Sequence, residues 1–301
     1  MYPQIAYTKE AWMVVTGGAG GLPLFKPDEG LRLLVLYTAG QHGDVELAHS
    51  VLQTMEFEGQ ACEEHHYAAL VEAYARAGEY AKIFSTLSKM RREGVAPSTS
   101  TTIAAIDALG ASEETVVSAL SALREQHDAG VEAVDVESFQ LVLSAYVKVG
   151  LLEAALDLYK DWPEVSPNFR LRPNAETFNI LLRGCADAGQ IEVASLLVDE
   201  MRVANVPLKD DSYDALIMSC VNAPTHPEKQ RPYQLGLMYL EKASNARLTL
   251  SQKTYEALAG RCIDEDDVES GMAVLDEMDR SGWDSAAARL KIHTRWREAQ
   301  R

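Results

Sequence analysis

The 301-residue chain has few cysteines and no long apolar run, and each absence excludes a class of protein. Its four cysteines form no Cys-x-x-Cys pair, so their spacing offers neither a zinc site nor a redox site. No apolar stretch approaches the ~18–20 residues of a membrane-spanning helix. The first 30 residues contain no arginine and several acidic residues, which matches neither a transit peptide nor a signal peptide. We therefore expect a chain that follows a removed presequence, is a fragment, or is not imported.

Positive charge is also scarce, because 28 lysines and arginines face 45 aspartates and glutamates, for a formal net charge of −17. Neutralisation of phosphates dominates the affinity of proteins for nucleic acid. A chain this acidic therefore has no global attraction to RNA. Any RNA binding would need local basic positions inside a repulsive field.

What the sequence does contain is a helical hairpin, clearest at residues 175–209. The first half has apolar residues at the i, i+3, i+4 and i+7 positions of a helix, namely Phe178, Leu181, Leu182 and Cys185. Gly189 then interrupts the pattern, because glycine is costly inside a helix and favours a turn. A second apolar stripe follows and ends before Pro207, which cannot continue a helix. The unit is about 35 residues long, the size of a helical repeat.

The same hairpin recurs between residues 29 and 286. An aromatic residue stands at the fourth place of the first helix, at Tyr67, Phe139, Phe178, Tyr213 and Tyr255. A glycine marks the turn, at Gly43, Gly78, Gly150 and Gly189, and a methionine lies near the end of the second helix, at Met55, Met90, Met201 and Met278. The third hairpin, near 99–135, has Ser112 to Glu114 in place of the glycine turn, and the fourth carries an insertion at 163–174. Because one hairpin cannot bury its own apolar stripe, the pattern predicts an all-α solenoid of about seven stacked hairpins.

These features resemble the pentatricopeptide repeat family. The resemblance covers residues 29–286 and rests on the 35-residue period together with the aromatic, glycine and methionine positions. It implies a right-handed superhelix with the first helices along the concave side. Residues 1–28 are expected to form an N-terminal cap segment and residues 287–301 a C-terminal capping helix, because the end of a solenoid needs cover.

The resemblance also implies a binding mode, in which single-stranded RNA lies along the first helices and two side chains per repeat read one base. One of these side chains directly follows the aromatic residue, and the other ends the motif. Carried onto this chain, the base-reading candidates are Gln140, Asn174, Asn179, Lys209, Asp214, Ser251 and Ser98. A basic residue two places before the turn glycine contacts phosphate in the family, and here that place is basic at Arg76 and Lys148. The same place is acidic at Asp187, so the transfer is uneven.

Other patterns favour structure over chemistry. The stretch from Thr16 to Pro23 resembles a dinucleotide-binding turn, but Pro23 replaces the last glycine and no strand–helix–strand pattern surrounds it. The Glu-Glu-His-His run at 63–66 suits no common metal-site spacing and is interpreted as a polar junction between hairpins, with a metal site as the minor alternative. The acidic run at 264–267 lacks the ligand order of a calcium loop. Equivalent positions in three successive hairpins carry cysteines, which favours packing, at Cys185, Cys220 and Cys262.

The tail contains a cationic cluster that could contact phosphate or a partner, or belong to a solvated capping helix: Arg289, Lys291, Arg295, Arg297 and Arg301 with Trp296. No nucleophile–base pair or cofactor motif is visible. We therefore predict a non-catalytic adaptor, without cofactor, metal, membrane or small-molecule substrate. By the resemblance it binds single-stranded RNA in organelle RNA processing, stability or translation, in the mitochondrion before plastid or cytoplasm. The alternative is a protein–protein scaffold such as a structural subunit of an organellar ribosome, and protein partners are expected for both.

Overall fold

A computed structural model describes residues 3–17, 26–128, 135–165, 173–224 and 231–291, and these residues form α-helices and no strand. The chain divides into two compact units, residues 1–149 and 150–301. The first unit contains α1 (Pro3–Thr16), α2 (Glu29–His42), α3 (Val45–Phe57), α4 (Glu64–Ala77), α5 (Tyr80–Arg92), α6 (Thr99–Leu109), α7 (Glu113–Asp128) and α8 (Val136–Val149). The second contains α9 (Leu152–Val165), α10 (Ala175–Ala188), α11 (Ile191–Val203), α12 (Asp210–Asn222), α13 (Pro232–Asn245), α14 (Gln252–Asp264) and α15 (Val268–Arg280).

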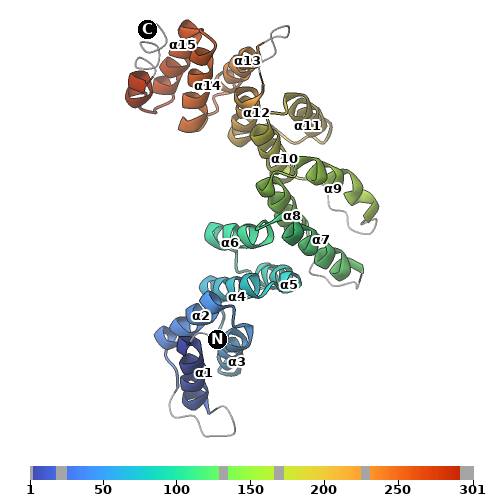
Figure 1. Ribbon diagram of the computed structural model, residues 1–301, viewed down its shortest axis with the longest axis vertical. Coiled ribbons are helices and arrows are strands. Elements are labelled where there is room, and N and C mark those ends of the chain that lie inside the picture. Colours follow the sequence, from blue (N-terminus) through green and yellow to red (C-terminus); the bar gives the residue numbers. More distant parts are fainter. Residues whose placement is uncertain (1–2, 18–25, 129–134, 166–172, 225–230, 292–301) are drawn as a thin grey trace. The chain divides into compact units, whose positions relative to one another are not determined.

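Within each unit, consecutive helices form antiparallel pairs and the first helices of the pairs pack on one another (Figure 1). In the first unit this row is α2, α4, α6 and α8, with α3, α5 and α7 as the second helices. In the second unit the row is α10, α12 and α14, with α11, α13 and α15 beside it. Helix α1 packs on α2 and buries Ile5 and Trp12. The predicted all-α class and the stacked hairpins are confirmed, and no described helix has the length and apolar character needed to cross a membrane.

The glycine turns form as predicted. Gly43, Gly78 and Gly189 end the first helices of three hairpins with φ between 64° and 73°, a left-handed conformation that costs other L-residues energy. In the last hairpin Asp266 takes this conformation at φ 62°. Aspartate is among the few other residues that visit the region, which explains how an acidic run replaces the glycine.

Three boundaries differ from the prediction. The third turn lies at residues 110–112, because Ser112 Oγ accepts a hydrogen bond from Thr115 N and thereby begins α7 at Glu113. Helix α9 continues through Pro163 to Val165, so the fourth insertion starts later than expected. Asp264 is the last residue of α14 and Asp267 caps α15, so the acidic run divides between two helices and a short turn.

The aromatic residue of the first helix closes its own hairpin. Tyr67 donates a hydrogen bond to the Glu93 carboxylate at the end of α5, and the Tyr255 and Ser281 hydroxyls lie 2.9 Å apart at the end of α15. In the first hairpin a buried arginine, Arg32, replaces the aromatic and pairs with the Glu58 carboxylate at 2.5 Å. Each pair is separated by 26 residues, so the same geometry recurs with different chemistry.

The three equivalent cysteines are fully buried in the core of the second unit, at Cys185, Cys220 and Cys262. Burial raises the pKa of each thiol to about 12, so each stays protonated and unreactive at neutral pH. Their expected role as small packing residues is confirmed.

Candidate functional site

The candidate site is the N-terminal edge of the first-helix row in each unit, where within a unit each first helix begins beside its predecessor. In six first helices the third residue is polar and buried, and these residues are His66, Thr101, Ser138, Thr177, Ser212 and Thr254. In α4, α10 and α12 the side chain at this place accepts a hydrogen bond from the backbone N–H of the residue before the helix. Glu63 N donates to His66 Nδ1 over 2.9 Å, and Lys209 N donates to Ser212 Oγ over 3.3 Å. The arrangement satisfies a donor that the helix leaves unpaired.

Three of the base-reading candidates cap their helices. Ser98, Asn174 and Ser251 each accept a hydrogen bond from the backbone N–H three residues on, over 3.1–3.3 Å. Such caps stabilise a helix by about 1 kcal/mol. The hydroxyls of Ser98 and Ser251 also lie 3.1 and 2.9 Å from those of Thr101 and Thr254, and Asn174 Oδ1 also accepts from Thr177 Oγ1 over 3.2 Å. Capping therefore occupies these side chains in part.

The two base-reading positions of a repeat lie together in the second unit. Both carboxylate oxygens of Asp214, on α12, accept from Ser251 N at 3.1 and 3.2 Å. Asn179 Oδ1, on α10, accepts from Ser212 Oγ at 2.8 Å, and Ser212 in turn accepts from Lys209 N. The structure thus brings together two predicted base-reading pairs. Asp214 contacts Ser251 directly, and Asn179 is linked to the backbone N–H of Lys209 through the hydroxyl of Ser212.

Asn179 is the base-reading candidate with the clearest remaining hydrogen-bonding capacity. Its side chain is 7% exposed, and its amide nitrogen donates to no residue in the described part of the chain. Gln140 on α8 is similarly buried, at 8% exposed, and lies in the first unit, whereas Asn174 lies in the second. An amide can donate to one base edge and accept from another, so Asn179 offers a donor to a base.

Both phosphate-position cations already have acidic neighbours. Arg76 Nη2 lies 3.1 Å from Glu72 Oε1 and 3.5 Å from Gln41 Oε1, and Lys148 Nζ lies 2.7 Å from Asp107 Oδ1. All of these ionic groups keep roughly a third or more of their side chains exposed. Exposed ion pairs contribute little stability, so a phosphate can displace the carboxylate at small cost.

The first unit contains a carboxylate that joins two successive first helices in the same way. Glu64 Oε1, on α4, accepts from Ser98 N at 3.1 Å and from Thr101 Oγ1 at 2.5 Å. Burial alone would raise the pKa of Glu64, but the hydrogen bonds from Thr101 and Ser98 hold it below its ordinary value. The carboxylate is therefore ionised and holds α6 against α4.

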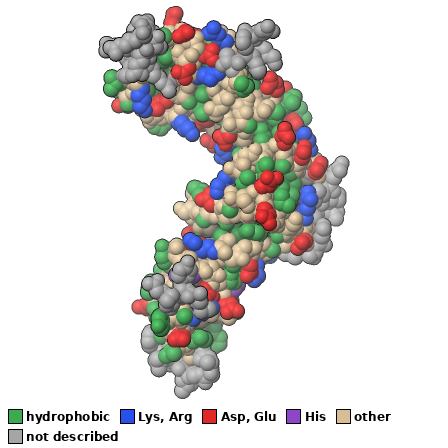
Figure 2. Space-filling view, in the orientation of Figure 1, with side chains coloured by type: hydrophobic (Ala, Val, Ile, Leu, Met, Phe, Trp, Pro, Cys, Tyr) green, Lys and Arg blue, Asp and Glu red, His purple; other side chains and the backbone are tan. Residues whose placement is uncertain are grey.

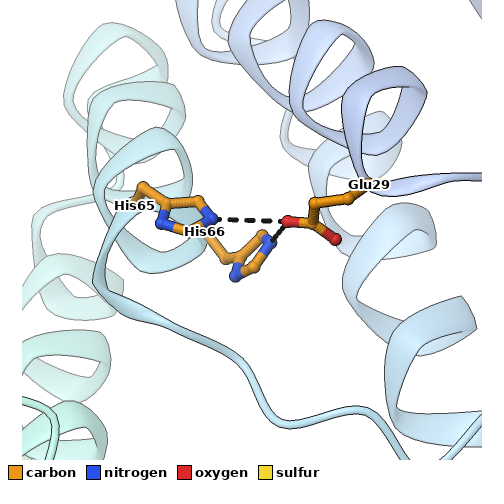
Figure 3. A group of neighbouring side chains, drawn as sticks. All are labelled: Glu29, His65 and His66. Carbon is orange, nitrogen blue, oxygen red and sulfur yellow. Dashed lines mark hydrogen bonds and ion pairs between the residues drawn. The ribbon is translucent and has the colours of Figure 1, made fainter.

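One group of potential metal ligands also lies on this edge. Glu29 of α2 points toward His65 and His66 of α4, and the candidate ligand atoms lie within 4.8 Å of one another (Figure 3). Glu29 Oε1 lies 2.7 Å from His66 Nε2 and 3.4 Å from His65 Nε2. Burial opposes ionisation of Glu29, but the hydrogen bonds from His66 and His65 hold its pKa below the ordinary value.

Comparison with known families identifies the repeat. A family model described as pentatricopeptide repeat-containing protein matches residues 29–162, and a model of the pentatricopeptide repeat itself matches residues 176–206. Together the two matches span more than half of the chain. The chain belongs to the pentatricopeptide repeat family.

Similar pentatricopeptide repeat proteins are much longer in sequence than the part that aligns. The human protein named pentatricopeptide repeat-containing protein 1, mitochondrial, is 29% identical over 121 residues, which cover 39% of this chain and 17% of the human protein. The rat protein of the same name is 28% identical over 142 residues, covering 44% of this chain and 20% of the rat protein. The crystal structure of the maize pentatricopeptide repeat protein PPR10 superimposes with a TM-score of 0.60 at 19% identity, over 98% of this chain and 39% of that chain. That likeness shows the fold.

Some contacts of these pentatricopeptide repeats were not anticipated from sequence. Glu64 and Ser212 carry the links between first helices, and Glu72 and Asp107 neutralise the phosphate-position cations. The capping partners could have been found, because a serine or asparagine followed three residues later by threonine recurs at 98–101, 174–177 and 251–254. Of the tail cations, Arg289 pairs with Asp276 and Asp279 of α15, whereas residues 292–301 lie outside the described part of the chain.

Proposed function

We propose that this chain is a non-catalytic pentatricopeptide repeat adaptor that binds single-stranded RNA along its row of first helices. Residues 29–286 form the binding region in this proposal, between an N-terminal cap segment of residues 1–28 and a C-terminal capping helix of residues 287–301. The work of such an adaptor is RNA processing, stability or translation. The mitochondrion is the proposed location, because the similar human and rat proteins are named as mitochondrial.

The observation that carries the proposal is the position of Asn179. Its amide nitrogen has no described partner, while its oxygen is fixed by Ser212 on the next first helix. A side chain held in one orientation with an open donor loses little entropy when it binds a base. Asn179 also follows the aromatic Phe178, the place where pentatricopeptide repeats read a base according to the family resemblance.

Phosphate contacts supply the affinity in this proposal. Arg76 and Lys148 occupy the family's phosphate position, and their acidic partners are exposed enough to be displaced. For single-stranded nucleic acid, each phosphate contact lowers the logarithm of the binding constant by about 0.7 for every tenfold rise in salt concentration. Two such contacts give an expected slope of roughly −1.4.

The test is a selection from a random RNA pool at low salt, followed by binding titrations over a salt series. We expect an enriched sequence, and Arg76→Gln or Lys148→Gln should each reduce the salt slope by about 0.7. Lys160→Gln is the matched control, because Lys160 is an exposed lysine on the second helix α9 and carries the same charge. An absence of binding at low salt, or equal effects of all three substitutions, would contradict the proposal.

A protein–protein scaffold, such as a structural subunit of an organellar ribosome, is the second candidate. It is favoured by the carboxylates of Asp187 and Asp214 on the first helices of the second unit and by the net charge of −17. On the face shown in Figure 2, acidic and basic side chains of the described residues are interspersed rather than sorted into a basic strip. Affinity capture that returns a stoichiometric protein partner, together with no RNA enrichment, would favour this candidate over the first.

A further inference from the structure

The junction between the first two hairpins carries a side-chain group that the other described junctions lack. Hydroxyl residues occupy the third place of α6, α8, α10, α12 and α14, whereas α4 has His66 there and His65 just before it. A hydroxyl has one atom for hydrogen bonding, but an imidazole has two nitrogens on different sides of the ring. The second nitrogen of His66 points to Glu29 on the preceding first helix, and so does a nitrogen of His65 (Figure 3).

We propose that Glu29, His65 and His66 form a zinc site that joins α2 to α4. Two imidazole nitrogens and one carboxylate oxygen are a ligand set that zinc uses where a fourth position is left to water. Two of the three ligands are half exposed, Glu29 at 50% and His65 at 43%, so the ion can enter from solvent and keep a water ligand. This inference does not depend on RNA binding.

The two distances to Glu29 require only a small adjustment, and all three ligand atoms lie within 4.8 Å of one another. With zinc–ligand bonds of about 2.0–2.1 Å in a tetrahedron, neighbouring ligand atoms are roughly 3.3 Å apart. Glu29 Oε1 and His65 Nε2 are already 3.4 Å apart, and Glu29 Oε1 and His66 Nε2 must separate from 2.7 Å. The two rings lie with centroids 4.0 Å apart, and His65 Nδ1 lies 3.8 Å from Glu63 Oε2. A carboxylate that accepts a hydrogen bond from the second ring nitrogen orients a zinc-bound histidine, and Glu63 would have to move about 1 Å closer to His65 to do so.

Two effects at the start of α4 oppose zinc binding: the loss of a hydrogen bond of His66 and the positive end of the helix dipole. Its Nδ1 accepts from Glu63 N, so the neutral ring carries its proton on Nε2, the nitrogen that faces Glu29. Coordination through Nε2 moves that proton to Nδ1 and breaks the bond with Glu63 N. The start of α4 is also the positive end of a helix dipole, which disfavours a cation. The carboxylates of Glu29 and Glu63 offset the second effect, and the loss of one capping bond predicts moderate zinc affinity that falls at low pH.

The experiment uses the full chain without a histidine tag, freed of metal with a chelator and titrated with Zn²⁺ by calorimetry and thermal melting. Three variants each remove one ligand: His65→Ala, Glu29→Gln and His66→Thr. Threonine is the third residue of α6, α10 and α14, and in α10 its hydroxyl accepts from the backbone N–H before the helix, as His66 Nδ1 does in α4. His42→Ala is the matched control, since it removes an exposed histidine from the end of α2 outside the group. Mg²⁺ is the control ion, because it prefers oxygen ligands.

One Zn²⁺ should bind per chain and, at about 100 times the dissociation constant, raise the melting temperature by roughly 5–10 °C. Each ligand variant should lower the Zn²⁺ affinity by about tenfold or more. Even mutation of residues that only hydrogen-bond to a metal ligand typically lowers metal affinity by roughly 10–100-fold. The His42→Ala protein should bind as the unchanged chain does. Absence of saturable Zn²⁺ binding, or equal binding by the unchanged chain and the His65→Ala and His66→Thr variants, would overturn the proposal and leave a hydrogen-bonded junction.

Discussion

The turn at Gly189 should be the glycine turn least tolerant of substitution. Its φ is +64°, and a Cβ added there would lie 2.7 Å from Asn222 O and 2.9 Å from Ala223 Cα. Both are backbone atoms at the end of α12 and cannot rotate away. Gly78 offers a matched comparison, because its φ is +73° but, among the described residues, an added Cβ would have one neighbour within 4 Å, Tyr80 Oη at 3.9 Å.

The two positions separate a conformational cost from a steric cost. The left-handed conformation costs an L-residue about 1–2 kcal/mol, so Gly78→Ala should lower the free energy of unfolding by roughly that amount. Gly189→Ala should add about 1–3 kcal/mol, because α10 and α12 must move apart to admit the methyl group. Gly189→Val should cost more still, because a branched side chain tolerates this conformation worst.

Asparagine distinguishes the two costs directly, since it tolerates the left-handed region. Gly78→Asn should be nearly neutral, whereas Gly189→Asn should retain the steric penalty. Urea denaturation followed by circular dichroism measures all five variants, and hydrogen exchange shows whether α10 and α12 lose protection together. Equal losses at the two glycines would refute the argument that the Gly189 turn packs against the end of α12.

Three further predictions concern side chains. Glu72→Gln or Asp107→Asn should raise RNA affinity up to about fivefold in a binding titration, because each frees a phosphate-position cation from an exposed pair worth ~0.2–1 kcal/mol; unchanged or weaker binding would contradict this. Glu58→Ala should cost about 3 kcal/mol in urea denaturation by leaving Arg32 buried without its carboxylate, whereas Arg32→Tyr should be better tolerated because tyrosine fills this place in α4. A hydrogen bond from the backbone N–H of Ser270 lowers the pKa of the Asp267 carboxyl below its ordinary value of 3.8. The ionised carboxylate therefore stabilises the fold fully at pH values above 3.8, and this stabilisation is lost as the pH falls through the lower folded-state pKa. The difference in melting temperature between the unchanged chain and Asp267→Asn, which keeps the cap without the charge, should therefore shrink at acid pH, and a constant difference would contradict the assignment.

Much of the fold could be predicted because local chemistry and global packing agree. Gly43, Gly78 and Gly189 marked turns that need a left-handed residue, and a buried aromatic residue marked the start of the first helix in α4, α8, α10 and α14. The turn at Asp266 was harder to place, because acidic residues are as typical of any solvent-exposed segment as they are of a left-handed turn. The third boundary was misplaced because Ser112 acts as a cap, which depends on a hydrogen bond and not on composition.

The site could be predicted only in outline. Spacing identified which residues begin each first helix, but whether a side chain is open to a ligand depends on neighbours a repeat away. Asp214 accepts from Ser251 N 37 residues on, and Lys148 meets Asp107 41 residues back. Such contacts arise from the stacking of repeats, so no local pattern contains them.

The side-chain hydrogen bond that closes three of the hairpins has a consequence for how repeats of this chain can be exchanged. Arg32 meets a glutamate and Tyr255 meets a serine, each 26 residues further on, so the two members of a pair must be inherited together. A chimaera that joined α2 to α15 in place of α3 would set the buried Arg32 guanidinium against the Ser281 hydroxyl, with no carboxylate to neutralise it. Recombination at the borders of whole hairpins avoids this mismatch, so crossover points between repeats should give folded chimaeras where those within a repeat do not.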